Sequence, residues 1–163
     1  MESRSAAAGV ETVLWFSSYD SVDGPMGLRS NDGKKRKSFG AFRTMTRELG
    51  AFTLGKHLIG GDHRGSGVQV YQFNHPSGGK HVLWDIDGTE TFVVSAKSLR
   101  SQSVRITGVQ GRPVPLETTK DGIRLNLSQA PIYVTGLPDG FSLEPASPAV
   151  PTAPTFLFPQ EIR

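Results

Sequence analysis

The chain has 163 residues, of which 36% are hydrophobic and 20% charged, a composition typical of a soluble folded protein rather than a disordered one. The 18 lysines and arginines exceed the 15 aspartates and glutamates by a net charge of only +3, too little to indicate nucleic acid or another polyanion as partner. The lack of cysteine excludes disulfides, thiolate nucleophiles and cysteine-based zinc sites, and no apolar run approaches the length of a membrane span or signal peptide, so membrane partners are not expected and the compartment stays unknown.

The first fifty residues predict a helix end, a buried strand, a long loop and a helix. Residues 1–8 favour a helix that stops at Gly9. Residues 10–17 form a mostly apolar run, which is typical of a strand covered on both faces in a parallel sheet. Residues 18–37 are rich in Gly, Asp, Ser and Asn and predict a loop, and residues 38–49 carry apolar side chains at helical spacing before Gly50 ends the helix.

From residue 52 onward short runs with a period of two predict an antiparallel β-sandwich or barrel. Residues 68–73 form an amphipathic strand, and residues 76–79 supply a turn into a strand at 81–86. Asp87-Gly88 is a strong hairpin signal, so residues 89–96 are expected to return beside that strand. Four more strands are predicted at residues 103–109, 113–118, 122–127 and 131–135.

The tail, residues 137–163, contains six prolines and is predicted to be extended and poorly ordered, apart from a docking of residues 156–158. The resulting organisation is a remnant at residues 1–50, a sandwich at 51–136 and the tail.

Motifs with a chemical meaning are weak. Residues 50–56 match a phosphate-binding loop, but His57 replaces the required Ser or Thr, and we interpret the stretch as a helix cap followed by a linker. Asp85-x-Asp87-Gly88 resembles part of a calcium loop, but Leu83 and Val94 occupy ligand positions, which leaves a hairpin turn. We therefore predict neither a metal nor a cofactor.

Two clusters of polar residues have plain structural interpretations. The histidines at positions 57, 63, 75 and 81 lack metal-binding spacing and are predicted to be surface or hydrogen-bonded residues. The basic cluster at residues 34–37 has no interleaved aromatic residue and is predicted to be a solvated loop ahead of the helix.

Several phrases of the sequence resemble one enzyme group. Residues 7–20 read AAGVETVLWFSSYD and are similar to the passage from helix seven into strand eight of retaining (β/α)8-barrel glycoside hydrolases, especially the xylosidase and iduronidase-like group. Residues 24–28, GPMGL, and the helix up to residue 49 resemble their following loop and last helix. Residues 82–84, VLW, and 127–136, LSQAPIYVTG, resemble strands of the sandwich that follows such barrels.

This resemblance implies a mainly β fold, namely an antiparallel β-sandwich preceded by a strand-loop-helix remnant of a (β/α)8 barrel. In these enzymes the two catalytic glutamates end strands four and seven, about 5 Å apart, and no residue of this chain matches either. The resemblance places Trp15 at the end of strand eight, where an aromatic ring forms the floor under the cleaved sugar. Tyr19 and Asp20 would hydrogen-bond sugar hydroxyls, although Trp15 fits ordinary core equally well.

Three functions remain open from the sequence. The chain is a catalytically silent C-terminal portion of a glycoside hydrolase, or a free-standing module that binds an oligo- or polysaccharide through Trp84, although a Trp in a sandwich strand is more often core. The third is an interaction protein that completes a partner's catalytic barrel, or self-associates, through the apolar strand at residues 10–16.

Overall fold

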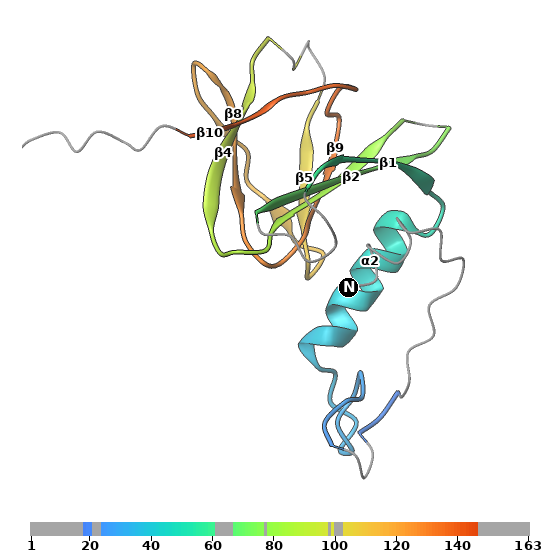
Figure 1. The fold of residues 1–163 in the computed structure, drawn as a ribbon. Coiled ribbons are helices and arrows are strands. Elements are labelled where there is room, and N and C mark those ends of the chain that lie inside the picture. Colours follow the sequence, from blue (N-terminus) through green and yellow to red (C-terminus); the bar gives the residue numbers. More distant parts are fainter. Residues whose placement is uncertain are drawn as a thin grey trace, which may run out of the picture.

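The computed structural model describes residues 18–20, 24–60, 67–76, 78–97, 99 and 103–146. They form two antiparallel sheets that face each other, with helix α2 (Lys37–Leu49) against the outer face of the larger sheet (Figure 1). The predicted β-sandwich preceded by a helix is therefore confirmed. The predictions for residues 1–17 and 156–158 lie outside the described residues. No helix within the described ranges is long and apolar enough to cross a membrane.

The six-stranded sheet has the order β1-β2-β3-β9-β5-β6, and the four-stranded sheet has the order β10-β4-β8-β7. In the six-stranded sheet the strands are β1 (Thr53–Ile59), β2 (Val68–Asn74), β3 (Lys80–Asp85), β9 (Ile132–Thr135), β5 (Arg105–Gly108) and β6 (Pro113–Val114). In the four-stranded sheet they are β10 (Leu143–Pro145), β4 (Glu90–Ser95), β8 (Gly122–Leu127) and β7 (Glu117–Thr118).

The main core lies between the sheets, where alternate residues of each strand point inward. Its buried members include Val70, Leu83, Leu125, Leu127 and Val134, each at most 1% exposed. A second cluster lies on the other face of the six-stranded sheet, under helix α2. Its members are Leu49, Tyr71, Phe73, Val82 and Tyr133, with Met45, Phe52 and Trp84 packed against them. Because the helix covers the sheet, the central strand β3 is buried on both faces.

Several predicted elements are confirmed. The helix predicted at residues 38–49 is α2. The strands on either side of the turn predicted at residues 76–79, β2 and β3, pair with each other, with Phe73 opposite Lys80. Strand β8 has the predicted limits, and β5 and β9 fall within theirs.

The hairpin predicted at Asp87-Gly88 is wrong. β3 and β4 belong to different sheets, so this turn carries the chain across the sandwich. Asp85 Oδ1 accepts the N–H of Asp87 at 3.1 Å, and Asp87 Oδ2 accepts the N–H of Gly67 at 2.7 Å. The first bond is local and shapes the turn, and the second joins the turn to Gly67, so the turn does not require the strands on either side to pair.

Three further predictions need correction. Residues 53–59, interpreted in part as linker, form β1, an edge strand with irregularities between Leu54 and Lys56 and between His57 and Ile59. The single strand predicted at residues 113–118 is divided into β6 and β7, which lie in different sheets. The tail is not uniformly extended from residue 137, because Leu137 and Phe141 are buried in the core and β10 pairs with β4.

Candidate functional site

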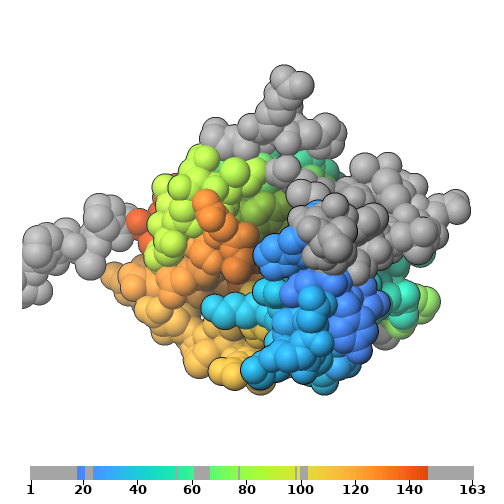
Figure 2. Space-filling model, turned by 90° about the horizontal axis from the view of Figure 1, so that it is seen from below, coloured from blue at the N-terminus to red at the C-terminus, as the bar shows by residue number. Residues whose placement is uncertain are grey.

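The loop ahead of helix α2 carries two of the three residues predicted to contact sugar. Trp15 lies outside the described residues. Tyr19 is 50% exposed and its backbone bridges to Arg29. Figure 2 shows this loop and the helix start, blue to light blue, as one continuous surface beside the yellow to orange part of the sandwich.

The carboxylate of Asp20 is occupied by partners within the loop. Arg36 makes a two-pronged ion pair with it, from Nε to Oδ1 at 3.2 Å and from Nη2 to Oδ2, and the N–H of Gly27 donates to Oδ1 at 3.2 Å. The hydrogen bond from Arg36 is the main reason that the pKa of Asp20 lies below its usual value. Asp20 is therefore ionised at neutral pH, and it organises the loop.

Gly27 is required by the close approach of two backbone segments. A Cβ atom at this position would lie 2.2 Å from the carbonyl carbon of Tyr19, closer than real atoms allow. The approach is held by backbone hydrogen bonds from Arg29 N–H to Ser18 O at 2.9 Å and from Asp20 N–H to Arg29 O at 3.1 Å. The second glycine of the GPMGL phrase is the sequence signal for this contact.

The basic cluster at the start of the helix is engaged locally. Lys34 pairs with Asp32 at 2.6 Å, and the side chains of Lys35 and Arg29 lie 5.0 and 5.2 Å from the ring centre of Phe39. Cations over an aromatic face are attracted to its electron density. These basic side chains thus close the loop around the first turn of α2.

A buried ion pair fixes the other end of helix α2 to the sandwich. Lys80, only 6% exposed on β3, donates to Glu48 Oε2 at 2.7 Å and to the carbonyl of Glu48 at 3.0 Å. Burial alone would raise the pKa of Glu48, but the hydrogen bonds from Lys80 and Arg47 outweigh it, and the pKa lies below its usual value. The carbonyl lies in the last helical turn, where a cation also complements the helix dipole.

A second contact fixes the first half of the helix. Gln110, in the turn between β5 and β6, donates from Nε2 to the carbonyl of Lys37 at 3.1 Å. A Cβ on Gly40 would lie 2.3 Å from Gln110 Oε1, so glycine lets the turn approach the helix. Together with the Lys80–Glu48 pair, this contact holds α2 at both ends.

Three rings stack on the outer face of the six-stranded sheet. The His57 and Tyr71 centres are 4.2 Å apart with 7° between planes, and those of Tyr71 and Trp84 are 5.4 Å apart with 5° between planes. Tyr71 is buried, whereas Trp84 is half-buried and His57 is exposed. Sugars bind the faces of aromatic rings, but both faces of Tyr71 are covered by its neighbours in the stack.

His81 is a feature that the sequence did not reveal. It is fully buried between the sheets, and neither ring nitrogen has a hydrogen-bond partner within the part of the chain described. The interpretation as a surface or hydrogen-bonded histidine is therefore wrong for this residue. Its position on a mostly apolar strand is the one signal of burial in the sequence.

Three of the described carboxylates lack the property that a general acid needs. A glycosidase needs one carboxyl whose pKa is raised so that it stays protonated, whereas the pKa values of Asp20, Asp32 and Glu48 are all lowered by their partners. Within the described ranges, no group of three or more acidic or histidine side chains could hold a metal ion.

Among the described residues, one hollow lies between the two sheets and another lies at the four-stranded sheet. The first, of about 380 Å³, has apolar walls that include Ile106, Val114 and Leu116. The other, of about 200 Å³, is more polar and includes Ser95, Asp121 and Glu144. Arg124, which pairs with Glu117 at 3.2 Å, borders both hollows.

Comparison with known proteins gives a relationship of fold. No family model matches the sequence, and no curated protein is significantly similar to it. A solved structure of a family 39 glycoside hydrolase from the gut symbiont Bacteroides cellulosilyticus WH2 is similar, with a TM-score of 0.61 and 22% sequence identity. The match covers 74% of this chain and 25% of that protein, so this chain spans about a quarter of its length. At this identity the likeness establishes a shared fold.

Proposed function

We propose that this chain is the non-catalytic C-terminal portion of a glycoside hydrolase of the xylosidase and iduronidase-like group, a sandwich appended to a sugar-cleaving barrel. The observation that carries the proposal is the fold shared with part of the family 39 enzyme over 74% of this chain. The order of loop, helix and sandwich agrees with the order of the phrases that resemble this enzyme group.

The contacts of helix α2 support a structural role. Lys80 and Glu48 join its last turn to β3, and Gln110 joins its first turn to the β5–β6 connection. A sandwich joined in this way to the last helix of a barrel would restrain that helix. Tyr19 and Asp20 would then belong to the sugar-facing loop, with Asp20 shaping the loop through Arg36 and Tyr19 offering its hydroxyl to the substrate.

The state of three described carboxylates supports the absence of catalysis. The acidic side chains with perturbed pKa values are held ionised by Arg or Lys, which is the opposite of what a general acid requires.

The test is hydrolysis of a mixed panel of aryl glycosides by the purified chain. We expect no turnover above that of buffer. Reproducible turnover that is abolished by Glu117→Gln or Asp139→Asn, and retained in the exposed control Lys120→Met, would refute the proposal.

A carbohydrate-binding module is the second candidate, favoured by the half-buried Trp84. It predicts affinity for a glycan on an oligosaccharide panel that is lost in Trp84→Ala and kept in Phe39→Ala, with both variants folded.

Light scattering on the same samples tests the third candidate, because a protein that completes a partner barrel through residues 10–16 should self-associate in isolation.

A further inference from the structure

Residues 137–146 bridge the two sheets across one end of the sandwich. They leave the six-stranded sheet after β9 and join the four-stranded sheet as β10, where Leu143 pairs with Val94. Leu137 and Phe141 are buried, and the N–H of Ala146 donates to the carbonyl of Thr91 at 2.9 Å. Two apolar side chains and a short edge strand thus account for most of the described attachment of this segment, which we name the bridging segment.

His81 lies directly under the bridging segment. Its ring meets that of Phe141 edge-on, with the centres 5.0 Å apart and 84° between planes. The imidazole is fully buried, and neither nitrogen has a partner among the described residues. A charged imidazolium in this position would have no acceptor, a costly arrangement in a dry interior. Burial accordingly lowers the pKa of His81 to about 4, against a smaller opposing effect of Asp139.

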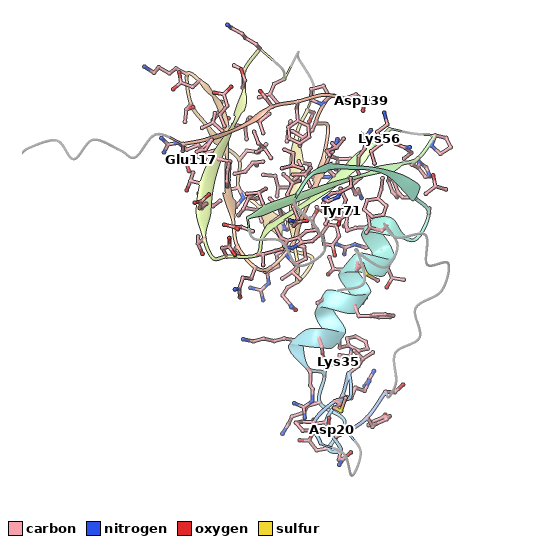
Figure 3. All side chains as sticks on the ribbon, viewed as in Figure 1. Asp20, Lys35, Lys56, Tyr71, Glu117 and Asp139 are labelled. Atoms are coloured by element: carbon pink, nitrogen blue, oxygen red, sulfur yellow. The ribbon has the colours of Figure 1, made fainter. Side chains whose placement is uncertain are left out.

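Among the described residues, Asp139 is the charged group that acts on the pKa of His81. On β2 its cross-strand neighbour is the neutral Gln72, and on β9 it is Val134. Gln72 donates to Asp139 Oδ1 of the bridging segment at 2.7 Å, and Lys56 of β1 pairs in register with Gln72. Figure 3 shows Asp139 and Lys56 at this same end of the sandwich. The bridging segment thus carries both the ring that seals His81 and the carboxylate that attracts a proton to it.

We propose that the bridging segment detaches from the sandwich in acid, when His81 takes up a proton, while the two sheets stay packed on each other. Opening lets water hydrate the imidazolium. It also exposes Leu137 and Phe141 to solvent and breaks the pairing of β10 with β4, both of which cost free energy. Local opening of an edge segment costs less free energy than unfolding of the whole domain. Release leaves the outer edge of β4 unpaired, so acid conditions expose a new strand edge.

The test is amide hydrogen exchange measured by mass spectrometry on the whole chain at about pH 7.5 and about pH 5, corrected for the intrinsic exchange rate. A histidine that titrates near 6.5 when open and about 4 when closed makes opening about thirty-fold more favourable at the lower pH. We expect peptides of residues 137–146 to lose about thirty-fold in protection, with no comparable loss in peptides of β8.

Non-titrating variants provide the control. In His81→Leu the protection of the bridging segment should be the same at both pH values. If this variant lacks a native near-ultraviolet spectrum, His81→Gln is measured in its place. Equal protection of the native chain at both pH values, an equal loss in these variants, or a parallel loss in β8 would overturn the proposal.

Discussion

Replacing Lys80 with methionine tests whether the buried ion pair holds helix α2 on the sandwich. The side chains of Lys80 and Glu48 are 8% and 13% exposed, and Lys80 donates to two acceptors, the carboxylate and the carbonyl of Glu48. Removing one partner of a buried pair costs about 3–5 kcal/mol. Arg47 remains beside Glu48 at 2.9 Å and is half exposed, so part of the charge stays compensated. We therefore expect Lys80→Met to lower the free energy of unfolding by about 3 kcal/mol.

The assay is urea unfolding at about pH 7, with Lys120→Met as the exposed control and Glu48→Gln completing a double-mutant cycle. The pKa of Glu48 in the folded protein lies below its ordinary value of 4.5, so the stabilisation is present above that pH and is lost as the pH falls through the folded pKa. The difference between native protein and Lys80→Met should accordingly shrink as the pH is lowered below 4.5. A loss below about 0.5 kcal/mol at neutral pH would refute the reasoning, because that is the range of ordinary surface substitutions.

Further substitutions test other contacts. Gly27→Ala places a Cβ against the backbone of Tyr19 and should lower the stability of the folded loop by about 1–3 kcal/mol. The measurement is proteolysis within residues 18–36, which should be faster in this variant and unchanged in Met26→Ala, a substitution at an exposed side chain. Phe141→Ala removes the ring that covers His81 and should lower the free energy of unfolding by about 3 kcal/mol, measured by thermal unfolding. The control Ser142→Ala should leave the free energy of unfolding unchanged. Arg36→Gln removes the main hydrogen bonds to Asp20 and leaves that from Gly27 among the described residues, so the pKa of Asp20, followed by carboxyl NMR, should rise towards its ordinary value.

The elements that the sequence predicted correctly are those decided by local pattern. Strand β8 alternates cleanly, and the glycine-containing turn at residues 76–79 joins two strands that do pair. Asp87-Gly88 is an equally good turn, but β4 pairs with β8 and β10 and not with β3. The choice between hairpin and crossover depends on distant residues.

The missed strands have weak local signals. β1 contains Gly55 and Lys56 and is irregular, and β10 is three residues long and ends in Pro145. Both are strands because a neighbouring edge was available for pairing. The burial of Phe141 has the same origin, since it depends on how the chain crosses from one sheet to the other.

The candidate site could be predicted only in part. The resemblance singled out Tyr19 and Asp20, but nothing local to Asp20 indicates Arg36, which lies sixteen residues later and converts it into a structural residue. The buried Lys80 and His81 were not predicted either, because one depends on a helix docking over β3 and the other on the bridging segment.

The edges of the two sheets have a consequence for aggregation. β1 is interrupted by two irregularities and carries the exposed Lys56, β6 and β7 have only two residues each, and β10 ends in a proline. Short, irregular, charged or proline-containing edges do not template the addition of strands from other molecules. At neutral pH these four edges therefore resist fibril growth. Acid release of the bridging segment would uncover the longer β4, which carries Phe92, Val93 and Val94. Acidic storage is therefore the condition under which this protein should be most prone to aggregate.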